Sequence, residues 1–225
     1  MKSSKVIILF LVLATMSSCL VSSLHPFFKK EDKRYDTTML GSWMDGDSCI
    51  WTIFPTMKSE EFMGPEKHDS SYTITYYEDK NRKTILQGTL FQLNGIQYVD
   101  FMPMPGEEHF QTDMTSYHHV PVHTLARVQY SRDSILLYWY GDEWLNELFE
   151  QNRIRIKHEA IEFADYERQL LTADTDELQK FIKKYANDPK TANEIEAIFT
   201  RGYTDGQEDM GVFLKLKPYQ GKVPD

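Results

Sequence analysis

Residues 84–102, TILQGTLFQLNGIQYVDFM, hold two apolar stretches on either side of Asn94-Gly95. An Asn-Gly pair in this position is the preferred type I′ turn of a β-hairpin, because both residues tolerate positive φ. The stretch therefore predicts two paired strands, Thr84–Leu93 and Ile96–Met102. The hairpin indicates that antiparallel pairing dominates this part of the fold.

Strand patterns continue on both sides of this hairpin. The further predicted strands are rich in β-branched and aromatic residues, which suit a pleated surface, and they cover residues 48–54, 71–77, 122–130, 134–140, 152–158, 167–171 and 211–217. Short helices are predicted after Asp142, behind the capping box Asp174-x-x-Glu177 and after Asp188-Pro189. Because βαβ alternation is absent, we expect a mainly β fold with a few peripheral helices, in which an antiparallel sheet closes on itself.

The segment before these strands adds a family resemblance. Leu40-Gly41-Ser42-Trp43 resembles the Gly-x-Trp motif that begins lipocalin-like barrels. In that family the Trp plugs the closed end of the barrel and the Gly lets the backbone turn into the sheet. The resemblance implies a lipocalin-like small barrel or a related closed sheet and makes Trp43 a candidate ligand-binding residue. Other β-sandwiches and open sheets are the alternatives.

Composition excludes several classes of protein. The chain has 225 residues, with 25 Lys and Arg against 34 Asp and Glu and a net charge of −9, so it lacks the basic surface of a nucleic-acid binder. A hydrophobic content of 41% is that of a globular protein rather than a disordered one. Two cysteines are too few for a disulfide scaffold.

The N-terminus has the pattern of an export signal. Lys2 and Lys5 precede the apolar run Val6–Ala14, which is too short to span a hydrocarbon core of about 30 Å. Residues 16–19, MSSC, then resemble a bacterial lipobox, in which the cysteine is lipidated and becomes the mature N-terminus. This resemblance implies that Cys19 is the lipidation site. The alternative is ordinary cleavage after Ser23, which would release a secreted protein.

These patterns divide the chain into three parts. Residues 1–18 are the expected lipoprotein signal peptide, residues 19–38 the lipidated cysteine and a flexible tether, and residues 39–225 a single β-rich domain. The tether is expected because residues 29–34, KKEDKR, are six consecutive charges with nothing to bury.

Two long segments with mixed Met, Pro, Gly and charge interrupt the strands, at Pro55–Ser70 and Pro103–His118. Loops of this length in a compact domain are usually functional or disordered, and we expect both to overhang one end of the barrel. Methionine adapts to varied apolar ligands, so Met102 and Met104 are candidate ligand-binding residues.

Histidines follow the second of these segments. On an extended chain His119 and His123 point to one face and His118 to the other, and about 13 Å between the first two is too far for one shared ion without a bend. We therefore favour ligand-binding or loop roles for His119 and His123 and predict no metal ion and no cofactor. A Cu(I) site that adds His109, Met102, Met104 and Met114 is the alternative.

No motif in the chain indicates catalysis. The nucleophile elbow, the zinc-protease helix, the Walker A loop and the dinucleotide fingerprint are all absent from the sequence. Cys49 lies in an apolar strand beside Trp51, where a thiol is expected to be buried and inert. We therefore predict no catalytic residue, and an enzyme is the least supported reading.

A second resemblance covers about a quarter of the chain. Residues 121–178 resemble uncharacterised exported lipoproteins of Gram-negative bacteria through Val122-His123-Thr124-x-x-Arg127-Val128, Asp142-x-Trp144-Leu145 and Leu171-Thr172-Ala173-x-Thr175-x-Glu177-Leu178. The resemblance implies a place in the cell envelope, at the outer membrane or the periplasmic face. His123 and Arg127 lie on one face of their strand, so they form either a polar spot inside the barrel or a satisfied core pair.

Together these patterns favour a membrane-anchored, non-catalytic envelope lipoprotein that binds an apolar or amphipathic ligand. Its expected partners are the membrane, through the lipid anchor, and a hydrophobic small molecule, and nucleic acid is excluded. The alternative is a structural or accessory envelope protein that acts through protein–protein contacts.

Overall fold

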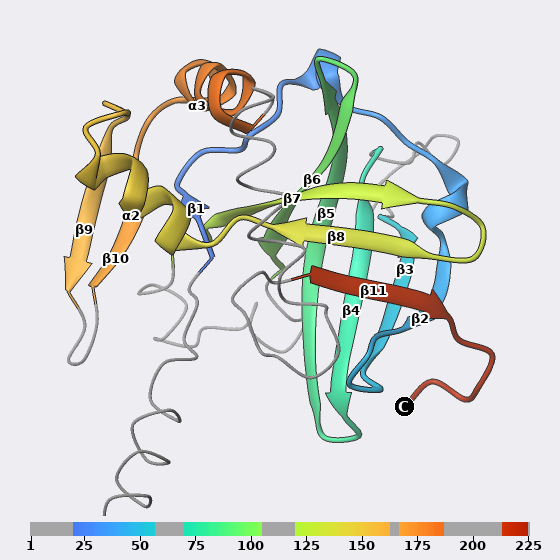
Figure 1. The fold of residues 1–225 in the computed structure, drawn as a ribbon. Helices are drawn as coiled ribbons and strands as arrows, with labels where there is room; N and C mark the ends of the chain where they lie inside the picture. Colours follow the sequence, from blue (N-terminus) through green and yellow to red (C-terminus); the bar gives the residue numbers. More distant parts are fainter. Residues whose placement is uncertain (1–19, 57–69, 105–119, 163–166, 187–212, 225) are drawn as a thin grey trace, which may run out of the picture.

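The computed structural model describes residues 20–56, 70–104, 120–162, 167–186 and 213–224, and its centre is a closed barrel (Figure 1). Eight strands form the barrel: β2 (Gly41–Met44), β3 (Ile50–Pro55), β4 (Tyr72–Asp79), β5 (Arg82–Leu93), β6 (Ile96–Pro103), β7 (His123–Tyr130), β8 (Ile135–Trp139) and β11 (Phe213–Pro218). Their order is β6-β5-β4-β3-β2-β11-β8-β7, and pairing of β6 with β7 closes the ring. Every pair in the ring is antiparallel, so the predicted lipocalin-like closed sheet is confirmed.

The hairpin that led to this prediction forms as expected. Leu93 pairs with Ile96, and the two residues between them have φ of 49° at Asn94 and 81° at Gly95. Positive φ at both positions is the requirement of a type I′ turn, which matches the twist of the flanking strands.

A lateral layer packs against one side of the barrel (Figure 1). It consists of α2 (Asp142–Glu150), β9 (His158–Glu162), β10 (Glu167–Leu171), α3 (Thr175–Phe181) and the π-helical turn η5 (Ile182–Ala186). The short strand β1 (Ser22–Ser23) joins this layer to the barrel, because it pairs with β7 on one side and with β10 on the other. In the described residues, no helix is long and apolar enough to cross a membrane.

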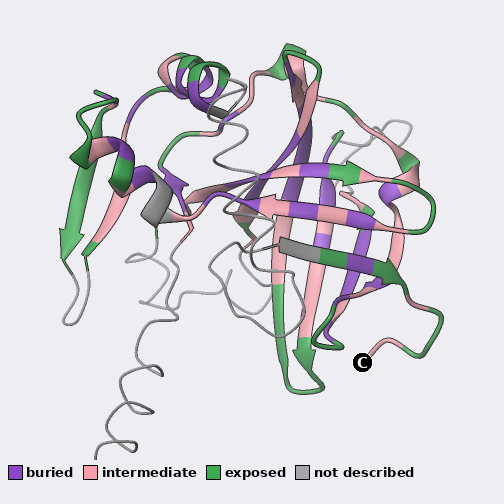
Figure 2. Ribbon diagram, viewed as in Figure 1, coloured by how far each residue is buried: buried purple, intermediate pink, exposed green. Residues whose placement is uncertain are grey.

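Two hydrophobic cores result from this arrangement, and buried positions follow the barrel strands (Figure 2). The barrel core fills the interior and includes Met39, Trp43, Trp51, Ile53, Tyr72, Ile74, Leu90, Val99, Phe101, Ala126, Val128, Ile135, Leu137, Trp139 and Leu216. The lateral core lies between the outer barrel wall and the lateral layer and includes Val21, Phe27, Phe91, Leu93, Tyr98, Leu125, Tyr140, Leu145, Leu148, Leu171, Leu178 and Phe181.

One end of the barrel is closed by the 3₁₀ turn η2 (Thr37–Met39), which is separated from β2 by Leu40 alone. Met39 is 2% exposed, and its carbonyl oxygen accepts a hydrogen bond of 3.0 Å from Nε1 of Trp43. Gly41 has φ of 129°, a conformation that side chains with a Cβ rarely adopt, so glycine allows the turn from η2 into β2. The indole N–H of Trp43 thus reaches η2, while its backbone pairs with Trp51 of β3.

A polar network holds η2 in place. The carboxylate of Asp36 accepts hydrogen bonds from the Thr38 backbone N–H at 2.8 Å and from the Tyr130 hydroxyl at 3.0 Å. The hydrogen bonds from Thr38, followed by that from Tyr130, lower the pKa of Asp36. Asp36 also donates its N–H to the Tyr72 hydroxyl at 2.7 Å, so both the side chain and the backbone of this residue are tied to barrel strands.

The expectation of a flexible tether does not hold for residues 20–38. Val21 is 2% exposed and Phe27 is 1% exposed, and the N–H of Val21 donates to the Tyr140 carbonyl oxygen at 2.8 Å. The charged run 29–34 contains the 3₁₀ turn η1 (Lys30–Asp32), which leaves its charges at the surface or partly exposed. Apolar residues ahead of the run supply the burial, so the folded part already includes Leu20.

Boundaries differ from the prediction in one further place. A strand was expected over 152–158, but the strand β9 begins only at His158. Residue Asn152 follows α2 with a positive φ of 53°, and residues 153–157 run without strand pairing.

The capping box of α3 is confirmed on its N-cap side, because the Asp174 carboxylate accepts a hydrogen bond of 2.9 Å from the Glu177 N–H. The helix expected after Asp188 lies outside the described residues.

Candidate functional site

Strand directions assign the loops to the two ends of the barrel. We call the end opposite η2 the distal end. Because η2 precedes β2 and neighbouring strands are antiparallel, β2, β4, β6 and β8 run from the closed end to the distal end. Pro55 and Tyr72 therefore lie toward the closed end, whereas Pro103 and His123 lie toward the distal end. The two Met- and Pro-rich segments leave the barrel at opposite ends, so the expectation that they overhang one end is wrong.

Two aromatic pairs occupy the interior toward the distal end. The ring centroids of Trp51 and Tyr76 are 4.7 Å apart, and those of Phe101 and Trp139 are 4.5 Å apart. Trp51 and Trp139 are each 7% exposed, and Tyr76 is half-buried. These rings form an apolar, polarizable cluster, and aromatic side chains of this kind also line sites for hydrophobic ligands.

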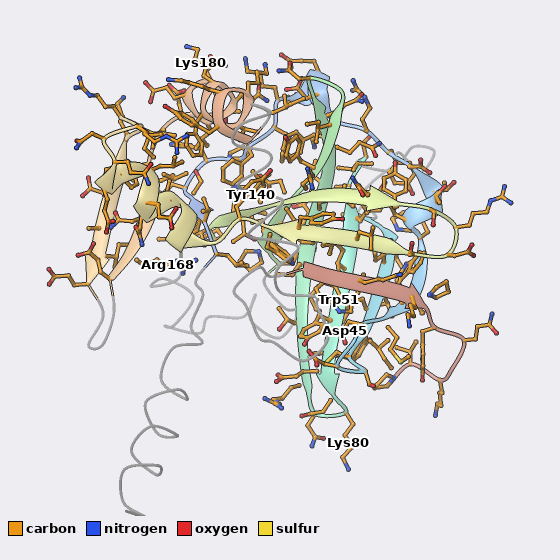
Figure 3. The ribbon with its side chains drawn as sticks, in the orientation of Figure 1. Asp45, Trp51, Lys80, Tyr140, Arg168 and Lys180 are labelled. Atoms are coloured by element: carbon orange, nitrogen blue, oxygen red, sulfur yellow. The ribbon has the colours of Figure 1, made fainter. Side chains whose placement is uncertain are left out.

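A buried carboxylate lies beside the first pair (Figure 3). Asp45 is 7% exposed, and its Oδ2 accepts a hydrogen bond of 3.0 Å from the Trp51 indole N–H. Its Oδ1 accepts the backbone N–H groups of Asp47 at 3.0 Å and Cys49 at 2.9 Å. The sequence pattern indicated only an acidic turn here, but the carboxylate also fixes the orientation of Trp51.

The thiol of Cys49 extends this cluster. Cys49 is a buried free cysteine, as expected, and its sulfur donates to the Glu78 carbonyl oxygen at 3.8 Å. Burial, together with the hydrogen bond to Cys49, raises the pKa of Tyr76 well above that of a free tyrosine. Tyr76 therefore stays neutral, and the site offers aromatic faces, one hydroxyl and one carboxylate.

A second polar cluster lies on the outer wall of the barrel, under the lateral layer. Nδ1 of His123 is 2.7 Å from Oδ1 of Asp100, and Oδ2 of Asp100 accepts the Phe27 backbone N–H at 2.9 Å. Asp100 is 1% exposed, and this burial raises its pKa, an effect that the hydrogen bond from His123 opposes. The pair ties β6, β7 and the segment before η1 together.

The Asp100–His123 pair does not have the surroundings of a catalytic dyad. Ser23 is opposite His123 in the strand register, but it is fully buried and its hydroxyl accepts the His25 N–H at 3.1 Å. A nucleophile needs access to substrate and a hydrogen bond to the base, and Ser23 has neither in the described structure. The pair is therefore a structural link.

Arg127 shares the outer face with His123, as the spacing of four residues predicted. Its guanidinium carbon lies 4.6 Å from the centroid of the Tyr138 ring, outside the barrel. A polar spot inside the barrel is therefore wrong, and the partner that the structure gives His123 on the outer face is Asp100.

The structure does not bring the sequence-predicted ligand residues together. Trp43 pairs with Trp51 and so borders the distal aromatic cluster, whereas Met102 and Met104 lie half-buried at and just beyond the distal end of β6, and Arg127 lies on the outer wall. The Met104 N–H donates to the Ile85 carbonyl oxygen at 2.9 Å. His119 and Cys19 lie outside the described residues, as do the His109 and Met114 of the Cu(I) alternative. In the described parts of the chain, no group of three or more His, Cys, Asp or Glu residues is arranged to hold a metal ion.

Fold and site together define an eight-stranded antiparallel barrel with a plug at one end, aromatic pairs toward the other and a lateral layer on its wall. No family model, curated protein or solved structure matches the chain.

Proposed function

We propose that this chain is a membrane-anchored envelope lipoprotein whose barrel binds an apolar or amphipathic ligand at its distal end. Two aromatic contacts carry the proposal, one between β3 and β4 beside Asp45 and the other between β6 and β8. Aromatic faces with a few fixed polar groups are typical of small-molecule sites.

Packing inside the barrel sets the depth of this site. Ile53, Ile74, Val99 and Val128 are each 2% exposed or less in the middle of the barrel. Interiors packed in this way hold few voids larger than a water molecule. The ligand therefore sits against the distal aromatic residues rather than deep in the barrel.

Two half-buried leucines that pack against the barrel core allow a matched test. Leu86 pairs with Pro103, the last residue of β6, at the distal end, whereas Leu40 directly precedes β2 at the closed end. We expect native mass spectrometry to find an apolar or amphipathic molecule on protein extracted gently from membranes. Leu86→Arg is expected to lower its occupancy at least about tenfold, an effect of about 1.4 kcal/mol, because the arginine places an unpaired charge beside the ligand.

Leu40→Arg is the control, and it should retain the ligand at similar thermal stability. Recovery of ligand-free wild-type protein even after incubation with total envelope lipid would contradict a ligand site in the barrel. Equal loss from both variants would place the effect on folding rather than on the distal end.

The anchor part of the proposal is supported by where the fold begins. Cleavage after Ser23 would remove Leu20–Ser23, and with them β1 and the buried Val21. Cleavage before Cys19 keeps these residues in the mature protein. The packing of this segment therefore favours the lipobox over the secreted alternative.

Metabolic labelling with a palmitate analogue tests the anchor. We expect label on the wild type and on Cys49→Ala, and complete loss of label from Cys19→Ala, because only Cys19 directly follows the expected signal peptide. Label that persists on Cys19→Ala would exclude lipidation at this residue.

A further inference from the structure

A groove of about 280 Å³ lies in the lateral layer, away from the barrel interior. It runs between the extended segment Ile154–Ile156 and the side of α3 and η5. Its floor is apolar, with Ile154, Phe181 and Tyr185 each less than 10% exposed. None of the residues that define it belongs to the barrel site.

The walls of the groove carry positive charge. Arg155 lies on one wall, and Lys180 and Lys184 lie on the other, four residues apart and therefore on one helical face. Figure 3 shows Lys180 at the outer surface of the lateral layer. The one acidic lining residue, Glu177, is 4.0 Å from the amine of Lys157. In the part of the chain that the structure describes, no ion pair within 4.0 Å engages the three wall cations.

This charge is opposite in sign to that of the chain, whose net charge is −9. An acidic protein repels anions at long range, so a local cluster of three cations around an apolar floor can select a ligand that brings both negative charge and an apolar group.

Contacts across the groove hold its shape. The Tyr185 hydroxyl donates a hydrogen bond to the Arg153 carbonyl oxygen, which joins the two walls. The rings of Phe181 and Tyr185 are 5.4 Å apart, and the amine of Lys184 lies 4.8 Å from the Tyr185 ring centroid. A groove that is already formed costs less ordering on binding than one that must assemble.

We propose that this groove binds an acidic peptide segment of a partner protein. One apolar side chain of the segment would contact Ile154, Phe181 and Tyr185, and carboxylates on either side of it would pair with Arg155 and with Lys180 and Lys184. A single-headed amphiphile such as a fatty acid would pair with one wall only. The groove is also slightly smaller than the roughly 300–1,000 Å³ typical of small-molecule pockets, which suits one inserted side chain. This site does not depend on a ligand in the barrel.

A displayed peptide library, selected on the full mature chain, tests the inference. We expect selected peptides to carry Asp or Glu on both sides of an aromatic or aliphatic residue. Their affinity should fall about tenfold or more in Lys180→Glu/Lys184→Glu, because two attractions become repulsions, and it should also fall with added salt.

The matched control is Lys80→Glu/Lys83→Glu, on the exposed β4–β5 hairpin at the opposite end of the molecule (Figure 3). It makes the same change in net charge and should leave the affinity unchanged. Selection of neutral or basic peptides, equal loss in both double variants, or no enrichment at all would overturn the proposal. So would charge-dependent binding of dodecanoate or phosphatidylglycerol vesicles in place of the peptides, and none of these results bears on the barrel ligand.

Discussion

We expect a chain that begins at Leu24 to be less stable than a chain that begins at Cys19, with a free energy of unfolding that is lower by about 4 kcal/mol. The missing residues include Val21, whose burial contributes about 1.5–3 kcal/mol, and the strand β1. Loss of β1 also leaves the Tyr140 carbonyl oxygen and the facing groups of β7 and β10 without their partners, at about 1 kcal/mol each. Urea denaturation of the two purified chains, followed by circular dichroism, measures the difference.

The control for this truncation is removal of residues 222–225 from the other end, where Lys222 is exposed. That change should cost less than about 1 kcal/mol, because the segment is at the surface and the 3.1 Å hydrogen bond from Tyr219 to the Lys222 carbonyl oxygen is exposed to solvent. If the chain from Leu24 is as stable as the chain from Cys19, β1 is dispensable. Cleavage after Ser23 then becomes as compatible with the fold as cleavage before Cys19.

Local sequence chemistry predicted most of the barrel because its signals are short in range. Asn94-Gly95 determines a turn through two backbone angles, and Asp174 caps α3 through one hydrogen bond three residues away. Gly41 and Trp43 mark the turn into β2 in the same way. Such features depend on neighbours in the sequence, so they can be read without knowledge of the tertiary fold.

The supposed tether shows where this reasoning fails. Six charges at 29–34 indicated a segment with nothing to bury, but Phe27 lies just before them and its N–H is 2.9 Å from a carboxylate of Asp100, 73 residues away. β1 is only two residues long, too short for a periodicity to reveal it. Its stability comes from the sheet edges that it joins, and this information is tertiary.

The candidate site was missed for a related reason. Composition favours Met102 and Met104, whereas the distal cluster is defined by strand alternation and register, which place Trp51 opposite Tyr76. The sequence indicates a turn at Asp45 and a strand at Trp51, but a carboxylate six residues from an indole forms a hydrogen bond only when the turn folds back on the strand. The spacing of His123 and Arg127 gave a shared face correctly, but it did not decide between the inner and outer sides of the barrel.

The largest effect of a single substitution is expected at Trp43. Trp43→Ala should lower the free energy of unfolding by about 3–5 kcal/mol, because it removes a 3% exposed indole from the plugged end and leaves a cavity beneath η2. Trp43→Phe keeps most of the apolar contact but loses the 3.0 Å hydrogen bond to the Met39 carbonyl oxygen, and it should cost about 1 kcal/mol beyond the change in packing. Chemical denaturation of both variants measures these differences.

Phe54→Ala provides the matched control, because Phe54 is an aromatic strand residue that is 55% exposed, and it should change stability by less than about 1 kcal/mol. The same variants separate the structural role of Trp43 from ligand binding. A structural role for the indole, which reaches η2, predicts that Trp43→Phe keeps the ligand occupancy of the wild type, whereas Leu86→Arg at the distal end loses it. If Trp43→Ala were nearly neutral, the structural role would be wrong. If Trp43→Phe emptied the barrel without loss of stability, the indole, which pairs with Trp51 in the strand register, would itself be part of the ligand site.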